Sequence, residues 1–252
     1  MKSVSFSKLA IAAAVVIVSG TALAQTKAPE PDYTLSYNVG AVTEYRYRGI
    51  SQSRLKPALQ GGVDYAHKSG FYLGAWASTI KWIKDAGATD GSVELDLYGG
   101  YKGEIAKDVG FDVGYLRYEY VGNKLGNVPG AANANTDELY GAVTYGPVTA
   151  KYSHSVSNLF GFVNSKNSGY LDLNATFDLG NGFSVVPHVG HQKVKNTSVA
   201  SYTDYSVTLN KDFGNGVSAS AAIVGTDTKV YVSPSGKNLG RDGLVLGVKY
   251  SF

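Results

Sequence analysis

Charged and aromatic residues alternate one by one in a stretch near the N-terminus, VTEYRYRGISQS. Glu44, Arg46 and Arg48 have one parity, whereas Tyr45 and Tyr47 have the other. Arginines interleaved with tyrosines are typical of nucleic-acid contacts, of polar sites and of surfaces where apolar and aqueous surroundings meet. The choice among these depends on the element that holds the stretch.

A second cluster with chemical potential, YSHSVSN, brings together His154, Ser155, Ser157 and Asn158. Nucleophilic hydrolysis needs a serine beside a histidine that a third group orients. Alternate side chains of a strand point to opposite faces, so His154 faces away from both serines. The stretch also offers no evident oxyanion-stabilising groups. The sequence therefore predicts that the protein is not an enzyme, and that His154 lies at a rim or an interface.

The spacing of histidines and carboxylates does not predict a metal site. His188 and His191 are three residues apart and face opposite sides of a strand, and His67 lies in a tight turn. Asp85 and Asp90 belong to a loop without the spaced oxygen ligands of a calcium site. The chain has no cysteine, which excludes disulfides and thiolate ligands. We therefore expect neither a metal nor a cofactor.

The first 24 residues have the pattern of a cleaved secretory signal peptide. Lys2 and Lys8 precede an apolar run over 9–18, and the tripeptide 22–24 reads Ala-Leu-Ala, a typical cleavage site. The alternative, an N-terminal membrane anchor, needs a longer apolar run. Loss of the two lysines lowers the formal net charge from +3 to +1. Export and near-neutral charge argue against nucleic acid as a partner.

Period-two alternation of apolar and polar residues runs along the remaining chain. Residues 93–101 read VELDLYGGY, and the stretches 171–179 and 244–252 alternate in the same way. Such alternation predicts strands with one apolar and one polar face. The expected strands, about twelve in number, span residues 33–48, 57–66, 71–83, 92–105, 109–121, 137–146, 148–158, 169–179, 183–194, 201–213, 217–230 and 240–252.

Short and long connections between these strands alternate without exception. The short turns are residues 67–70, 106–108, 146–147, 180–182 and 214–216. The longer links, rich in Gly, Asn, Ser and Lys, are residues 49–56, 84–91, 122–136, 159–168, 195–200 and 231–239. Turns at one end and loops at the other are typical of an outer-membrane barrel, with short periplasmic turns and longer extracellular loops.

The sequence therefore predicts an all-β, transmembrane, antiparallel up-and-down β-barrel over 33–252 in the bacterial outer membrane. Residues 25–32 form a short periplasmic N-terminal segment in this scheme. Closure of the sheet satisfies every backbone group within lipid. The ending LVLGVKYSF resembles an outer-membrane assembly signal, which makes the barrel-assembly machinery an expected partner of Phe252. The alternative is a soluble secreted β-sandwich or lipocalin-like barrel, which rarely needs a dozen meander strands with one-sided loop length.

Under the barrel scheme, the polar face lines the lumen and the apolar face meets lipid. The lumen candidates are Glu44, Arg46, Arg48, Asp64, Glu94, Asp96, Asp112, Glu138, Lys151, Asp172, Asp178, Asp204 and Lys249. The candidates for the aromatic membrane belt are Tyr37, Tyr45, Tyr47, Tyr250 and Phe252. In the strand 109–121, a bulge near Gly114 would place Arg117 and Glu119 in the lumen; alternatively, Arg117 snorkels at the rim.

The segments YNVGAVTEYRYRGISQS and PALQGGVDYAHKSGFYLGAWAS resemble the beginning of the TorF family of porins. The resemblance is most specific over Tyr37–Ser78 and extends as a general pattern through the terminal GVKYSF. It implies an outer-membrane β-barrel with channel activity, in a family that is also described as a bacterial group of unknown function. It brings no substrate and no catalytic residues.

Two functions follow from this scheme. The first is a porin-like channel for small hydrophilic solutes or ions, in which the lumen charges filter solutes and the longest loop, 122–136, is a candidate for constricting the mouth. A barrel of about twelve strands favours a narrow pore over a wide one. The alternative is a plugged structural or adhesive barrel whose loops bind a partner. The expected surroundings are outer-membrane lipid, and the sequence leaves the oligomeric state open.

Overall fold

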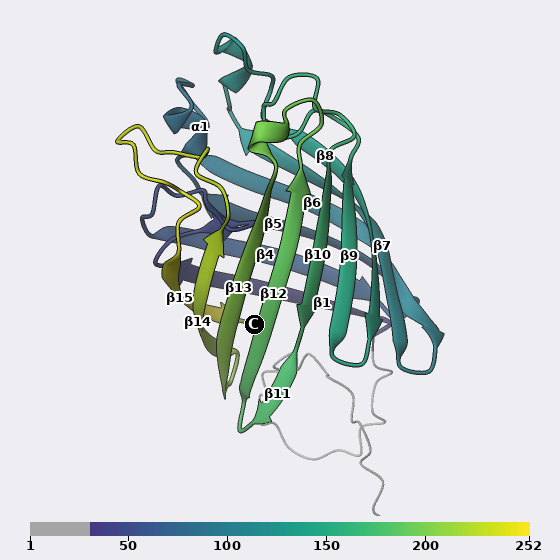
Figure 1. Cartoon of the computed structure of the whole chain (residues 1–252). Helices are drawn as coiled ribbons and strands as arrows, with labels where there is room; N and C mark the ends of the chain where they lie inside the picture. Colours follow the sequence, from purple (N-terminus) through teal and green to yellow (C-terminus); the bar gives the residue numbers. More distant parts are fainter. Residues whose placement is uncertain (1–30) are drawn as a thin grey trace, which may run out of the picture.

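The structure, a computed structural model, describes residues 31–252 and is a closed antiparallel β-barrel of twelve strands (Figure 1). Neighbouring strands pair in chain order, and β1 closes the barrel against β15. The wall strands are β1 (Tyr33–Val42), β4 (Ala58–His67), β5 (Phe71–Thr79), β6 (Val93–Ala106), β7 (Val109–Val121), β8 (Thr136–Tyr145), β9 (Val148–Ser155), β10 (Gly169–Ala175) with β11 (Phe177–Gly180), β12 (Phe183–Lys193), β13 (Tyr202–Gly214), β14 (Val217–Thr226) and β15 (Gly243–Ser251). β10 and β11 are two parts of one wall strand, because both pair with β12. The predicted barrel is confirmed.

The remaining elements are short and lie in the connections. β2 (Arg46–Tyr47) and β3 (Ile50–Ser51) form a separate two-stranded ribbon. The helical turns are α1 (Trp82–Asp85), η1 (Leu125–Asn127) and η2 (Ser198–Ala200). Within residues 31–252, no helix is long and apolar enough to cross a membrane. The predicted signal peptide and residues 25–30 of the predicted periplasmic segment lie outside the described residues.

Short turns gather at one end of the barrel and long loops at the other (Figure 1). Two of the turns have the sequence Asn-Gly, at Asn181–Gly182 and Asn215–Gly216, and all four residues have φ between 51° and 80°. Positive φ at both central residues is the requirement of a type I′ hairpin turn, which Asn and Gly meet at low steric cost. The predicted alternation of connections is confirmed.

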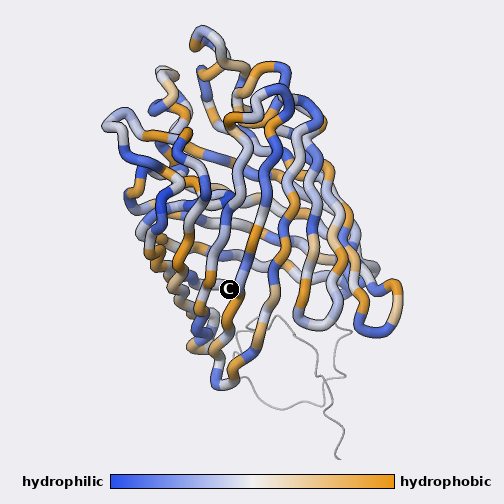
Figure 2. The backbone as a smooth tube through the Cα atoms, in the orientation of Figure 1, coloured by the Kyte–Doolittle hydropathy of each residue, from blue (hydrophilic) through white to orange (hydrophobic). Residues whose placement is uncertain are grey.

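The outer face of the barrel is apolar. Hydropathy alternates along the strands in Figure 2, and the outward side chains include Leu59, Leu73 and Ile223, which are 67%, 65% and 63% exposed. Such a surface would be unfavourable in water, whereas it is the ordinary face of a barrel in lipid. Outward aromatic rings stack near the short-turn end, as in the pair Tyr37–Phe252 with centroids 5.7 Å apart. Both rings face outward, as a membrane belt requires, and their place in a belt stays a prediction.

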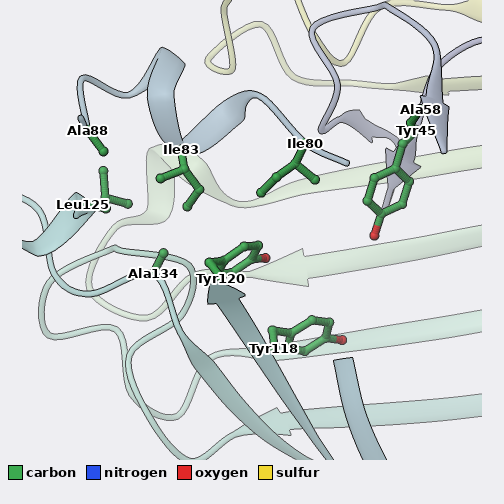
Figure 3. Packing of buried hydrophobic residues seen from close by; sticks show 9 residues of the cluster. All are labelled: Tyr45, Ala58, Ile80, Ile83, Ala88, Tyr118, Tyr120, Leu125 and Ala134. Carbon is green, nitrogen blue, oxygen red and sulfur yellow. The ribbon is translucent and has the colours of Figure 1, made fainter. Parts of the chain in front are cut away.

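The main cluster of buried apolar side chains lies at the long-loop end (Figure 3). Tyr118 and Tyr120 project from β7, Ile83 from α1 and Leu125 from η1, and all four are at most 3% exposed. Tyr45 completes the cluster from the segment that follows β1. The loops therefore pack against one another and against the inner wall.

Glycines and tyrosines interlock on the inner face of the wall. Four glycines have no room for a Cβ, because a tyrosine of an adjacent strand lies over each of them. The pairs are Gly74 with Tyr98, Gly100 with Tyr72, Gly114 with Tyr140, and Gly190 with Tyr170. A Cβ on Gly114 would lie 2.5 Å from the Tyr140 hydroxyl oxygen. This packing gives a physical reason for the abundance of the two residue types.

Candidate functional site

The chain leaves the barrel wall after Val42, although the sequence predicted that the strand continues to residue 48. We call residues 43–57 the inner segment, because its central part folds into the barrel. Tyr45 is 8% exposed, and Tyr47 packs against the buried cluster. The prediction that Tyr45 and Tyr47 belong to the membrane belt is therefore wrong. The outward positions of Tyr37, Tyr250 and Phe252 are unaffected, with 42–56% of each residue exposed.

Backbone and side-chain contacts explain this course. The Tyr45 amide donates to Ser53 Oγ at 2.9 Å, and the Gln52 amide donates to the Tyr45 carbonyl at 2.7 Å. The segment thus closes on itself as a loop. Burial raises the pKa of the Tyr45 hydroxyl well above its usual range, and the Glu94 carboxylate raises it further. The protonated hydroxyl donates to Glu94 Oε1 at 2.6 Å, which ties the loop to β6.

Arg46 is held almost entirely by acceptors of the loops. Its Nη2 pairs with Glu44 Oε1 at 2.9 Å. Its Nη1 donates to the carbonyls of Gly49, Leu239 and Arg241 at 2.9–3.0 Å. The guanidinium therefore anchors the inner segment to the loop before β15, although its buried Nε atom has no hydrogen-bond partner among residues 31–252.

Arg48 crosses the lumen. Its Nη2 lies 2.7 Å from Glu138 Oε2, and its Nη1 donates to Glu138 Oε1 at 3.1 Å and to Gln192 Oε1 at 2.6 Å. The guanidinium also lies 4.2 Å from the centroid of the Tyr170 ring. A planar fork paired with a carboxylate in this manner is a strong, directional contact. We call this group, Arg48 with Glu138, Gln192 and Tyr170, the crosspiece.

A polar cavity of about 410 Å³ adjoins the crosspiece. We call it the lower cavity; its lining includes Arg46, Tyr47, Arg48, Asp96, Tyr118, Lys151, Ser153, Tyr170, Asp172, His188, Asp204 and Ser206. Several of these side chains are already paired. The His188 Nε2 atom lies 2.7 Å from Asp204 Oδ2, and its Nδ1 atom lies 3.2 Å from Asp172 Oδ2. The cavity therefore has fixed charges of both signs within a closed wall.

Tyrosine hydroxyls donate to other inner carboxylates of the wall. Tyr98 bonds to Asp64 Oδ1 and Tyr72 to Asp112 Oδ1, each at 2.5 Å. Of the predicted lumen residues, Asp178 and Lys249 lie close to the short turns, where both are exposed and neither lines the lower cavity; their place in the lumen stays a prediction. The sequence thus named most of the inner carboxylates, whereas their tyrosine partners were missed.

A larger cavity of about 630 Å³ opens between the long loops, and we call it the outer vestibule. Its lining is mainly apolar and includes Ile50, Trp82, Leu125, Val128, Leu159, Phe160, Phe162, Tyr202 and Tyr231. Burial raises the pKa of Tyr231, whose hydroxyl donates to the Ala200 carbonyl at 2.7 Å. Tyr47 lines both cavities. The inner segment therefore separates an apolar outer space from a polar inner one, while the loop 122–136 contributes to the vestibule wall.

Residues 26–252 match the model of a family described as "Bacterial protein of unknown function (Gcw_chp)". The chain belongs to this family. No curated protein matches the sequence. Solved structures with a similar fold include the KdgM porin (TM-score 0.55, 9% identity, covering 86% of this chain and 99% of that chain). The NanC porin has a TM-score of 0.54 and 10% identity, covering 87% of this chain and 99% of that chain. The COG4313 outer membrane channel from Pseudomonas putida F1 has a TM-score of 0.51 and 13% identity, covering 88% of this chain and 96% of that chain. At these identities the likeness shows the fold alone.

In this Gcw_chp protein, the second predicted cluster has no catalytic geometry. His154 of β9 pairs across the sheet with Leu139, whose side chain is on the outer face, whereas Ser155 pairs with the inward Glu138. The Ser155 hydroxyl donates to the Ser157 carbonyl at 2.6 Å. Histidine and serine thus lie on opposite faces, as the parity of the strand predicted.

The structure also settles the two alternatives for β7. Register runs without a shift through Gly114, so no bulge resets the parity there. Arg117 and Glu119 face outward and pair at 2.6 Å, and Arg117 also contacts Asp137 at 3.0 Å. The apolar residues higher in β7, among them Tyr118, point inward instead. The charged group lies near the loop end of the wall, where an arginine is predicted to snorkel.

The inward tyrosines and His188 are the main residues that sequence reasoning missed. Tyr98 has the parity of Glu94 and Asp96 on the same strand, and His188 is two residues from the glycine at position 190 that lies under Tyr170. An even spacing from a charged, inward residue of the same strand was therefore a signal that such a side chain also points inward. A tyrosine side chain fits either face of a barrel wall, so its residue type alone does not predict that it points inward.

Proposed function

We propose that this chain is an outer-membrane channel that passes small hydrophilic solutes or ions through a narrow lumen. The observation that carries the proposal is the polar cavity of about 410 Å³ within a closed barrel whose outer face is apolar. A lining with charges of both signs lets water and polar solutes occupy the cavity, whereas the apolar outer face requires lipid. The porin-like fold supports the same conclusion.

The crosspiece is the proposed filter. Arg48 spans from the inner segment to β8 and β12, so a solute that moves between the outer vestibule and the lower cavity passes beside its guanidinium. Charged rings and constrictions of this kind set selectivity by size and charge. Twelve strands also enclose a lumen narrower than that of the sixteen-stranded porins.

Single-channel recording tests the channel directly. Purified protein is refolded, its barrel is verified by heat-modifiable migration on a gel, and current is recorded in potassium chloride after insertion into a planar bilayer. We expect discrete conductance steps that are small for a porin, because the crosspiece narrows the lumen. Verified insertions that give no steps in repeated recordings refute the channel.

A plugged barrel is the second proposal, and the pairing of its inner charges favours it. Arg48 with Glu138 and Arg46 with Glu44 are ion pairs whose side chains are at most 10% exposed. Replacement of both arginines by alanine separates the two functions. Either kind of barrel loses stability, but a channel also changes its ion selectivity, whereas a plugged barrel conducts neither before nor after the change. Loss of partner binding after loop deletion, with no change in conductance, would favour an adhesive role for the loops.

Three predictions from the sequence belong to the same proposal. The first is export through the signal peptide at residues 1–24, and the second is assembly in the outer membrane through recognition of Phe252. The third is membership of the TorF family, which the resemblance over Tyr37–Ser78 implies. Replacement of Phe252 by alanine tests the second: we expect less folded barrel in cells but normal refolding of the purified chain.

A further inference from the structure

The outer vestibule has the lining of a site for an uncharged molecule. Its volume of about 630 Å³ lies within the usual range for ligand pockets, and its walls are mainly apolar and aromatic. Asp85 is the one charged side chain among the described residues that line it, and its carboxylate is taken by Arg54, whose Nε donates at 2.8 Å. A charged ligand would therefore lose hydration here without gaining a free counter-charge from the lining.

Aromatic rings form two groups in this lining. Trp82 meets Tyr120 with ring centroids 5.1 Å apart and an interplanar angle of 89°. The rings of Tyr202 and Tyr231 meet at 5.4 Å and 73°, and Phe162 lies 6.5 Å from Tyr231. Aromatic rings prefer offset-stacked or edge-to-face contacts with another ring. The lining therefore favours a ligand with an aromatic ring over an aliphatic one.

Tyr202 contributes a polar group that has no partner in the described chain. The residue lines the vestibule and is 6% exposed, and its hydroxyl forms no hydrogen bond with any of residues 31–252. The hydroxyls of the other lining tyrosines have partners: Tyr47 with Tyr118, Tyr120 with Glu94, and Tyr231 with the Ala200 carbonyl. A buried hydroxyl without a partner costs free energy, which a hydroxyl group of a ligand would recover.

Tyr202 lies beside the crosspiece, whereas the exposed part of the lining is apolar. Tyr202 pairs across the sheet with Gln192, which accepts from Arg48 and also lines the vestibule. Three valines of the loops line the vestibule and are 46–52% exposed, namely Val163, Val230 and Val232. Exposed apolar side chains that continue into a cavity are typical of binding sites. The vestibule thus has a polar end at the crosspiece and an apolar end at the loops.

We propose that the outer vestibule binds small uncharged aromatic molecules of the phenol class, with the ring among the aromatic side chains and the hydroxyl group at Tyr202. A phenol hydroxyl both donates and accepts, so it bonds to the Tyr202 hydroxyl in either direction. The site goes beyond the proposed channel, because it lies on the loop side of the crosspiece. A molecule binds there whether or not it passes through the barrel.

Tryptophan fluorescence of the refolded protein in lipid vesicles tests both the binding and its place. The chain has two tryptophans: Trp82 lines the vestibule, whereas Trp76 lies on β5, outside the lining. Trp76→Phe leaves Trp82 as the reporter, and Trp82→Phe leaves Trp76. We expect p-cresol, which is uncharged at neutral pH, to change the fluorescence of Trp82 in a saturable manner and to leave that of Trp76 nearly unchanged. Equal changes of both reporters mean partition into lipid only and overturn the inference.

Two further probes and one variant test the chemistry of the site. Toluene lacks the hydroxyl group of p-cresol, and p-toluate carries a carboxylate in its place. In the Trp76→Phe background, p-toluate should bind more weakly than either uncharged probe. Adding Tyr202→Phe should weaken the binding of p-cresol about two- to tenfold, the contribution of one neutral hydrogen bond, and should not weaken that of toluene.

Tyr205→Phe is the matched control. Tyr205 belongs to the same strand but lies outside the lining, and its hydroxyl donates to Asp242 at 2.7 Å. This variant should leave the affinities for p-cresol and toluene unchanged, and heat-modifiable migration confirms that each variant is a folded barrel. Equal losses of p-cresol affinity in the two tyrosine variants overturn the inference. So does a Tyr202→Phe variant that binds p-cresol as tightly as its parent.

Binding and conduction are measured separately, so the two proposals fail separately. Saturable binding of p-cresol at Trp82, in a barrel that gives no conductance steps, supports the site and refutes the channel alone. Conductance steps together with no saturable response of Trp82 refute the site alone.

Discussion

Replacement of Arg48 by alanine removes the central contact of the lumen. The Arg48 side chain is 6% exposed and that of Glu138 is 1% exposed, so the variant leaves a buried carboxylate without its cation. The remaining bond to Glu138 Oε2 comes from the Tyr118 hydroxyl at 3.2 Å. The inner segment also loses the contacts of the guanidinium with Gln192 and the Tyr170 ring.

Removal of one partner from a buried ion pair costs about 3–5 kcal/mol, because the other charge remains desolvated. The lower cavity adjoins this site and supplies some hydration, so we expect a loss near the lower end, about 3 kcal/mol in the free energy of unfolding. Arg48→Ala combined with Glu138→Gln removes the stranded charge. The double variant should therefore regain a large part of the free energy of unfolding that Arg48→Ala loses. A double-mutant cycle measures this recovery.

Urea unfolding in lipid vesicles, followed by heat-modifiable migration, measures the free energy. Lys68→Ala is the control, because it removes the cation of an ion pair that both partners expose to solvent. The Lys68 and Asp32 side chains are 68% and 57% exposed, so the loss of this pair should cost no more than about 1 kcal/mol. Equal losses in the two variants, or no recovery in the double variant, would refute the reasoning about the crosspiece.

The remaining predictions concern the packing around the lumen. Tyr45→Phe removes the 2.6 Å bond to Glu94, which is 1% exposed, so we expect a loss of about 1.5–3 kcal/mol and faster proteolysis of the inner segment by added protease. Gly114→Ala places a Cβ 2.5 Å from the Tyr140 hydroxyl oxygen and should cost about 1–3 kcal/mol in urea unfolding. Gly141→Ala, whose Cβ meets its nearest atom at 4.0 Å, should change stability far less, and equal effects of the two alanines would contradict the packing.

The wall of the barrel could be predicted from the sequence because its determinants are local. Alternation with a period of two marks the strands, and Asn-Gly turns mark the tight connections, as at 181–182. Parity also assigned carboxylates such as Glu94 and Glu138 to the inner face, where each now has a partner. These features depend on residues a few positions apart, which a single sequence contains.

The course of the inner segment could not be predicted in this way. Tyr45 and Arg46 point to opposite sides whether the strand stays in the wall or folds into the barrel. The alternation of residue types is therefore the same for both courses and does not distinguish them. The contacts that determine the course of the inner segment come from residues far away in the chain. Tyr45 bonds to Glu94, 49 positions away, and Arg48 bonds to Glu138, 90 positions away. A tyrosine that is typical of a membrane belt is equally suited to a buried hydrogen bond.

The contacts that fix the inner segment are also those that narrow the lumen, so stability and conduction are expected to oppose each other. The crosspiece holds the segment against β8 and β12, and the same guanidinium lies between the apolar vestibule and the polar cavity. A variant that loosens Arg48 should therefore lose stability and gain conductance together. A barrel plugged for structural reasons alone would show the first effect without the second. The joint measurement on one set of variants thus separates a filter from a plug, which neither measurement does alone.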